Sequence, residues 1–238
     1  MNIAIIFAGG VGQRLNNNIN AIPKQFIEIN GKPILVHTLE HFQNHKEIDK
    51  IYIAMLENYI DYTKELVQNF NLNKVKGIVK GGTCGQESIY NALCAAEKEN
   101  PENSIVLIHD GVRPIITEEV ITDNIESVKK YGTGITSTPC YETILVSKDG
   151  KTPIHVPLRQ ETFAAQAPQS FRLGEILTAH RKIQKNGYDG IIDSCTLFHL
   201  LGKKTRLVKG NFGNIKITTQ QDIYILKGIL DYKDERNK

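Results

Sequence analysis

The earliest residues that could take part in chemistry follow a short apolar run near the N-terminus. The run is Asn2–Phe7, and the small residues after it are Ala8, Gly9, Gly10 and Gly12. Glycines at a strand end let the backbone approach a ligand closely, and their N–H groups can hold phosphate oxygens. Arg14 and Lys24 add two cations nearby. The pattern indicates a phosphate-binding loop, although a glycine turn alone often only reverses the chain.

The spacing excludes two familiar phosphate loops. The third glycine of a dinucleotide-binding loop is missing, because Leu15 stands at its position. Gly202–Thr205 lacks the upstream glycine of a Walker A loop. A different kind of phosphate site is therefore expected.

A carboxylate and further cations follow other apolar runs. Asp110 comes just after Ser104–Ile108, and the cations are Arg113, Arg159 and Lys216. Ligand sites in α/β proteins lie at the carboxyl ends of parallel strands. A carboxylate placed there can hold Mg²⁺ against phosphate oxygens. We therefore expect Asp110 to be a metal ligand.

The elements that must position these residues alternate between strand and helix. Strands are predicted at Asn2–Phe7, Lys50–Met55, Val75–Val79, Ser104–Ile108 and Gly134–Pro139, and later at Thr205–Val208 and Asn214–Thr218. Helices are predicted from Pro33 and at Tyr59–Phe70, Gln86–Lys98, Thr117–Lys130, Gly174–Lys185, Asp193–Leu201 and Gln220–Asp231. The early strands are apolar without clean alternation, which is typical of a parallel sheet covered on both faces. The predicted fold is α/β, with a Rossmann-like, mostly parallel sheet flanked by helices.

The segment Tyr141–Leu158 breaks this rhythm. Two β-prone runs, Ile144–Val146 and Ile154–Val156, surround an Asp-Gly turn and predict a hairpin. We interpret it as an arm inserted at about 139–160 in a single domain that spans residues 1–238. A lone hairpin is marginally stable in water. Its apolar faces therefore predict a homodimer in which two arms clasp each other.

Composition limits the function classes. The 238 residues carry a net charge of +3, which is weak for a nucleic-acid-binding protein. No apolar run approaches the ~20 residues of a membrane span, and no signal peptide is visible. The four cysteines form no CxxC, and His37, His41 and His45 have no acidic or cysteine partner for a metal. A cytoplasmic protein without disulfides, zinc, nucleic acid or membrane partners is expected.

The ordered motifs resemble those of a known enzyme family. They are Gly9–Arg14, Pro23–Gln25, Gly81-Gly82 with Ser88, His109–Pro114, Arg159, Pro168–Phe171 and Asn214–Thr218. Together they are similar to the cytidylyltransferases that act on 2-C-methyl-D-erythritol 4-phosphate or ribitol 5-phosphate. The resemblance covers nearly the whole chain and implies a nucleotidyltransferase that uses CTP and a divalent cation. Charge neutralisation and alignment dominate such a transfer between two anions.

The resemblance also implies a role for each site residue. Catalytic contacts with the triphosphate fall to Arg14, Lys24 and Lys216. Nucleotide binding falls to Ala8, Gly9, Gly10, Gly12, Gly82, Thr83, Ser88 and Asp110, with Asp110 also the ligand of Mg²⁺ or another divalent cation. The sugar phosphate would contact Arg113, and Thr143 and Arg159 would reach it from the neighbouring subunit.

Some positions depart from the methylerythritol pattern. Thr83 and Gly85 stand where its glycine loop carries Asp and Arg, and Gly213 replaces an Asp that could be a second metal carboxylate. Val156–Arg159 and Asp193–Cys195 are more similar to the ribitol type. The favoured reaction therefore joins CTP and a sugar-alcohol phosphate, D-ribitol 5-phosphate, to give a CDP-alcohol and pyrophosphate for wall or capsule polymers. The alternatives are the methylerythritol reaction of isoprenoid precursor synthesis and a catalytically silent nucleotide-binding relative.

Overall fold

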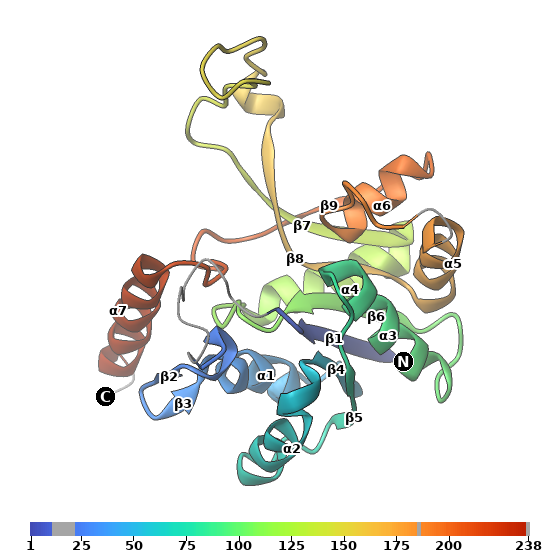
Figure 1. Cartoon of the computed structure of the whole chain (residues 1–238), viewed down its shortest axis with the longest axis vertical. Coiled ribbons are helices and arrows are strands. Elements are labelled where there is room, and N and C mark those ends of the chain that lie inside the picture. The colour runs from blue at the N-terminus through green and yellow to red at the C-terminus, as the bar shows by residue number, and fades with distance from the viewer. Residues whose placement is uncertain (11–21, 185–186, 237–238) are drawn as a thin grey trace.

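The computed structural model describes residues 1–10, 22–184 and 187–236, and these build a seven-stranded sheet (Figure 1). The strands are β1 (Asn2–Ala8), β4 (Lys50–Met55), β5 (Val75–Lys80), β6 (Ile105–Asp110), β7 (Thr133–Pro139), β8 (Phe163–Arg172) and β9 (Leu207–Lys209). Their order across the sheet is β5-β4-β1-β6-β8-β7-β9. Pairs β5·β4, β4·β1, β1·β6 and β7·β9 are parallel, whereas β8 runs antiparallel to both β6 and β7. The predicted mostly parallel α/β sheet is confirmed.

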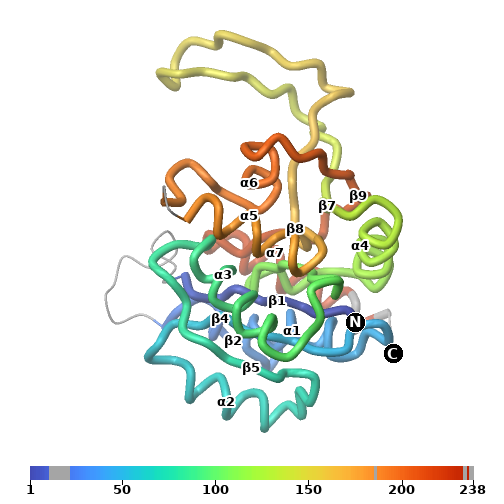
Figure 2. Tube along the Cα trace, turned by 90° about the vertical axis from the view of Figure 1, so that its right-hand side faces the viewer, coloured from blue at the N-terminus to red at the C-terminus, as the bar shows by residue number. Residues whose placement is uncertain are grey.

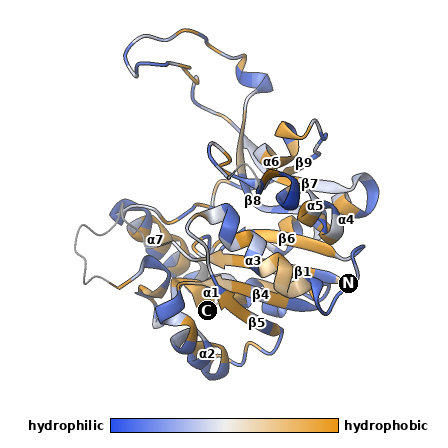
Figure 3. Cartoon of the chain, turned by 45° about the vertical axis from the view of Figure 1, so that its right-hand side comes forward, coloured by the Kyte–Doolittle hydropathy of each residue, from blue (hydrophilic) through white to orange (hydrophobic). Residues whose placement is uncertain are grey.

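Helices cover both faces of the sheet because its central strands are apolar on both sides. Side chains alternate along β1, so Ala4 and Ile6 join one core cluster while Ile3 and Ile5 join the other. The first cluster lies against α1 (Ile34–Asn44), α2 (Ile60–Asn69) and α4 (Glu118–Tyr131). The second lies against α3 (Gly85–Glu97), α5 (Leu173–Gln184) and α6 (Ser194–Leu200). Figure 3 shows the hydrophobic strands between these two helix layers.

A third, smaller cluster attaches the end of the chain. The two-stranded ribbon of β2 (Glu28–Ile29) and β3 (Lys32–Pro33) lies beside α7 (Gln220–Arg236) in Figure 1. Ile217 and Leu226 are completely buried there. This packing holds the segment before α7 close to the end of β6.

Two strand predictions need correction. Strand β8 was not predicted, because its sequence has no β-branched residue and contains Pro168. It forms because it pairs with strands on both sides and buries Phe171. Conversely, the strand predicted at Asn214–Thr218 is absent. That segment crosses the end of β6, with one backbone bond from Ile217 N to Val112 O at 2.9 Å, instead of joining the sheet.

The arm is present, but its predicted strands are not. Residues 140–158 contain a single bridge, between Val146 and His155. The predicted turn does form, with Asp149 Oδ1 accepting bonds from the N–H groups of Lys151 and Thr152, both at 2.8 Å, and with Gly150 at a φ of +70°. Figures 1 and 2 show the arm projecting from the body of the protein. A ribbon whose aliphatic side chains stay exposed gains too little to order a longer ladder.

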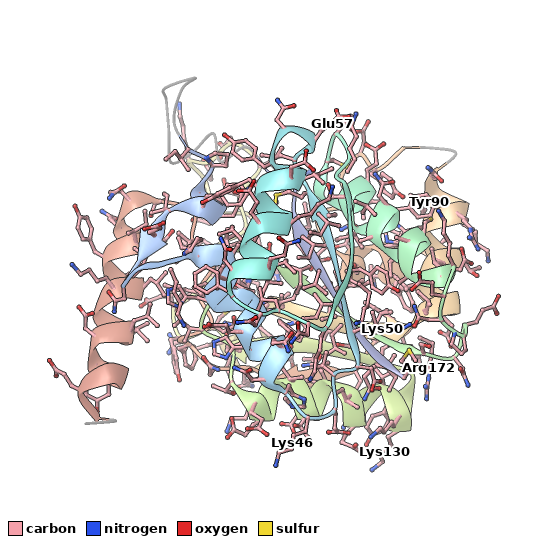
Figure 4. The ribbon with its side chains drawn as sticks, turned by 90° about the horizontal axis from the view of Figure 1, so that it is seen from below. Lys46, Lys50, Glu57, Tyr90, Lys130 and Arg172 are labelled. Atoms are coloured by element: carbon pink, nitrogen blue, oxygen red, sulfur yellow. The ribbon has the colours of Figure 1, made fainter. Side chains whose placement is uncertain are left out.

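The outer surface is charged. Figure 4 shows Lys46 and Lys130 pointing away from the sheet at one edge and Glu57 at the opposite edge. The other predicted late strand, Thr205–Val208, corresponds to β9, which begins two residues further on. Among the described residues, no helix combines the length and apolar character needed to cross a bilayer.

Candidate active site

A cavity of about 570 Å³ lies at the carboxyl ends of the three central parallel strands. In the sheet register Phe7 is level with Asp110, and Ala8 is level with Met55, so the loops after β1, β4 and β6 open at one edge. Predicted site residues that line the cavity are Ala8, Gly9, Gly10, Lys24, Gly82, Thr83, Ser88, Asp110 and Lys216. The fold therefore brings together most of the residues that the motifs singled out.

The glycine turn after β1 packs closely on the start of α3. A Cβ atom on Gly9 would lie 2.9 Å from the Ser88 hydroxyl oxygen, so only glycine fits without a shift. Ser88 Oγ accepts a bond from Gly82 N at 2.9 Å and donates to Cys84 O at 2.9 Å. Ser88 thus holds the loop between β5 and α3 against the glycine turn.

Gln25 supports the same turn from the other side. Its side chain is buried, and Nε2 donates to Ala8 O at 2.8 Å and to Gly10 O at 3.4 Å. Because these carbonyls are held, the turn keeps a fixed shape beside the cavity. Gln25 lies in the predicted Pro23–Gln25 motif, although we did not expect it to have a role of its own.

Glu87 orders the loop in which Thr83 and Gly85 depart from the methylerythritol pattern. Thr83 donates from both its backbone N–H and its hydroxyl to Glu87 Oε2, each at 2.6 Å. These bonds from Thr83 lower the pKa of Glu87. Gly82 is required here, because a Cβ atom at that position would collide with the Glu87 side chain. The altered loop therefore remains hydrogen-bonded at the cavity rim.

Three charged side chains meet at the end of β6. Asp110 Oδ1 lies 2.5 Å from Lys216 Nζ, and Asp110 Oδ2 lies 3.0 Å from Arg113 Nε. Burial favours a raised pKa for Asp110, but the charges of Lys216 and Arg113 outweigh it and hold that pKa below its ordinary value. The arrangement is a buried carboxylate with one cation on each oxygen.

Lys24 joins this group from the N-terminal part of the chain. Its Nζ donates to Ile217 O at 2.8 Å, next to Lys216. Arg113 holds the same segment through a bond from Nη1 to Asn214 O at 2.7 Å. The two cations thus hold the backbone on both sides of Lys216.

A second chamber of about 300 Å³ adjoins the first. Both are lined by Phe7, Gly85, Asp110 and Lys216, so the Asp110–Lys216 pair is part of their common wall. Arg113 lines only the second chamber. This chamber also contains residues that we did not predict as site residues: Gln86, Gln166, Gln169, Asp193 and Ser194. Three of them, Gln169, Asp193 and Ser194, lie in the quoted motifs Pro168–Phe171 and Asp193–Cys195, which were the available signal.

Two predicted residues lie away from both chambers. Thr143 and Arg159 are exposed on the arm and line neither chamber, and Arg159 Nη2 donates to Thr143 Oγ1 at 2.9 Å. Gly12 and Arg14 fall outside the described residues. The arm pair is therefore separate from the cavity within one subunit.

The predicted divalent cation needs ligands at the end of β6. Across residues 1–10, 22–184 and 187–236, no three His, Cys, Asp or Glu side chains are grouped to hold an ion. Among the described residues that line the first cavity, Asp110 is the acidic one. Mg²⁺ commonly takes one or two carboxylates and completes its shell with substrate phosphates and water. The residues fit an ion that arrives with a triphosphate.

Comparisons with known proteins agree with the geometry. The model of the family "2-C-methyl-D-erythritol 4-phosphate cytidylyltransferase" (IspD) matches residues 2–232. A ribitol-5-phosphate cytidylyltransferase of Vibrio parahaemolyticus is 46% identical and covers 98% of each chain. A 2-C-methyl-D-erythritol 4-phosphate cytidylyltransferase of Clostridium botulinum is 36% identical, covering 97% of each. The crystal structure of 4-diphosphocytidyl-2C-methyl-D-erythritol synthase from Anaerococcus prevotii is similar, with a TM-score of 0.82, 29% identity and coverage of 97% of this chain and 96% of that one.

Proposed function

The chain belongs to the IspD family of cytidylyltransferases, and we propose that it joins CTP to D-ribitol 5-phosphate. The products would be a CDP-alcohol for wall or capsule polymers and pyrophosphate. One observation carries the proposed transfer: Lys216 and the buried Asp110 form a pair that stands between two adjacent chambers. One chamber suits a triphosphate and the other suits a smaller phosphorylated acceptor.

The proposed reaction is a single displacement at phosphorus. An oxygen of the acceptor phosphate attacks the α-phosphorus of CTP and forms a new P–O bond. The bond from the α-phosphorus to the α,β-bridging oxygen breaks, and its electrons leave with pyrophosphate. Lys24 and Lys216 face the first cavity, where they offset charge that develops at the α-phosphate.

The backbone and the metal ligand complete the triphosphate side. The N–H groups of the glycine turn at Gly9 and Gly10 are proposed to hold phosphate oxygens. Gly82, Thr83 and Ser88 border the same cavity and are proposed to hold the cytosine. A divalent cation bound there would neutralise triphosphate charge, with Asp110 as its protein ligand.

The acceptor assignment rests on similarity of sequence. The ribitol-type relative shares 46% of aligned residues and the methylerythritol-type relative 36%. The motifs Val156–Arg159 and Asp193–Cys195 favour the same assignment. The methylerythritol reaction remains the second candidate, supported by the family match over residues 2–232.

We propose further that the enzyme is a homodimer whose arms complete the sites. Six large apolar side chains of the arm are exposed: Ile144, Leu145, Val146, Ile154, Val156 and Leu158. A two-fold dimer would bury them reciprocally. Thr143 and Arg159 would then bind the acceptor phosphate of the neighbouring subunit, since a guanidinium group binds phosphate through two parallel bonds.

Oxygen labelling tests the proposed chemistry. The acceptor is prepared with ¹⁸O in its phosphate and incubated with CTP, Mg²⁺ and the enzyme. Mass spectrometry should find all of the label in the CDP-alcohol and none in pyrophosphate. Labelled pyrophosphate would contradict attack by the acceptor. CTP that binds but never turns over with any acceptor would favour a silent relative.

A further inference from the structure

Three side chains in the wall of the second chamber carry a buried polar atom without a hydrogen-bond partner among the described residues. They are Gln86 (Oε1), Gln166 (Oε1) and Ser194 (Oγ). Gln86 is 3% exposed and Ser194 1% exposed. Buried polar groups are usually paired, because losing their bonds to water is unfavourable. Three such atoms around one small chamber therefore call for an explanation.

The other polar side chains of this wall are paired. Gln169 Nε2 donates to Asp193 Oδ2 at 2.8 Å, and Gln169 Oε1 accepts from Cys195 N at 2.9 Å. Asp193 Oδ1 accepts from Thr196 N at 2.7 Å. These bonds fix the loop that carries Ser194. The wall is thus ordered, and its unpaired atoms are not a sign of loose packing.

Gln86 and Gln166 present the same chemical group. Gln166 Nε2 donates to Asn211 O at 3.0 Å, so the carbonyl oxygen is the unpaired end of this amide. The unpaired atom of Gln86 is also a carbonyl oxygen. An amide carbonyl only accepts hydrogen bonds, whereas the Ser194 hydroxyl can donate or accept. A matching ligand must therefore carry several donors, as a chain of hydroxyl groups does.

We propose that Gln86, Gln166 and Ser194 select the acceptor by binding the hydroxyl groups of its carbon chain. The inference rests on the proposed function, because it places the acceptor in the second chamber. The acceptor phosphate lies toward Asp110, Arg113 and Lys216, and the polyol extends along the wall that carries Gln86, Gln166 and Ser194. When the ligand binds, the side chains of Gln86, Gln166 and Ser194 rotate and turn their unpaired atoms toward it. An acceptor that lacks a hydroxyl leaves its partner unpaired and is rejected.

Steady-state kinetics of Ser194→Ala and Gln86→Leu test the proposal. Each variant should raise the KM for ribitol 5-phosphate roughly 3- to 10-fold, the loss expected for one neutral hydrogen bond. The KM for CTP should stay within about twofold, because these atoms lie outside the triphosphate contacts. Ser104→Ala is the matched control. Ser104 also has a buried, unpaired hydroxyl and is 1% exposed, but it lines neither chamber.

Two further readouts separate recognition from a structural role. Removing an unpaired buried hydroxyl should not lower the melting temperature of Ser194→Ala, even though the KM rises.

The second readout is the kcat/KM for the four deoxyribitol 5-phosphates, each of which lacks one hydroxyl group. At least one of these analogues should be rejected strongly by the wild type and much less by Ser194→Ala or Gln86→Leu. If both variants keep the wild-type KM and the wild-type ranking of analogues, this inference is overturned while the proposed function stands. A wild type that releases no pyrophosphate with any acceptor would overturn the proposed function and this inference together.

Discussion

Lys216 Nζ and Asp110 Oδ1 lie 2.5 Å apart, although Asp110 stands near the middle of the chain and Lys216 near its C-terminal end. Asp110 ends the buried strand β6, whereas Lys216 stands in an irregular segment fixed by Lys24 and Arg113. Only 8% of the Asp110 side chain is exposed, against 38% of Lys216. The pair therefore joins a rigid carboxylate to a lysine that remains open to ligand.

Removal of the divalent cation should abolish activity. The charge of the triphosphate must be neutralised before another phosphate approaches, and Asp110 is the carboxylate available in the cavity lining. Pyrophosphate release measured across a Mg²⁺ titration should fall to background in excess chelator. Asp110→Asn should fail to recover at saturating Mg²⁺. Full activity in chelator would refute the metal requirement, and an active Asp110→Asn at low Mg²⁺ would relocate the site.

Lys24→Ala should lower kcat/KM by roughly 10²–10³. Loss of one preorganised donor to developing charge typically costs ~3–4 kcal/mol of transition-state stabilisation. The exposed pair of Lys80 with Glu57 offers a control, since Lys80→Ala removes a cation at the surface and outside the cavity lining. A Lys24→Ala enzyme with near wild-type turnover would remove Lys24 from the catalytic residues.

Mixing two inactive variants tests whether the arm serves the neighbouring subunit. Lys216→Ala and Arg159→Ala should each be nearly inactive. A mixed dimer would contain one site with both defects and one with neither. Random pairing makes about half of the dimers mixed, so roughly a quarter of wild-type activity should return.

The control for this experiment is direct detection of the mixed dimers, with a different affinity tag on each variant. Inactive mixtures that demonstrably contain mixed dimers would show that Arg159 acts within its own subunit. The arm would then have a structural role only.

The motifs singled out residues that the fold brings to one cavity, whereas periodicity missed one strand of the sheet. The glycine turn, Lys24, Asp110 and Lys216 all reach one cavity, because each follows or neighbours a strand that ends at the same edge. Strand β8 escaped prediction because tertiary pairing outweighed its weak propensity. The motif Asp193–Cys195 pointed to Ser194, but its meeting with Gln86 and Gln166 in one wall could not be predicted, because the three residues are separated in sequence and meet only through the fold.

Acid should destabilise the protein partly through His180. The side chain is buried, Nδ1 lies 3.0 Å from the Tyr188 hydroxyl, and burial lowers its pKa from 6.5 to about 4. The unfolded state therefore binds more protons between pH 6.5 and 4, so the free energy of unfolding decreases as the pH falls through this window. The full contribution of this residue is roughly 3 kcal/mol.

Melting temperatures measured from pH 7.5 to 4 should therefore fall less steeply for His180→Phe than for the wild type. The variant also leaves the Tyr188 hydroxyl without its imidazole partner, which lowers stability equally at every pH. Parallel melting curves for the two proteins across the whole range would contradict the predicted role of His180.

A competition between the two candidate acceptors tests the central claim most directly. Equimolar ribitol 5-phosphate and 2-C-methyl-D-erythritol 4-phosphate are incubated with limiting CTP, Mg²⁺ and the wild-type enzyme, and the CDP-alcohols are separated by mass. Product ratios report the ratio of the two kcat/KM values. CDP-ribitol should exceed the methylerythritol product at least ~10-fold. A predominance of the methylerythritol product, or no CDP-alcohol from either acceptor, would contradict the account.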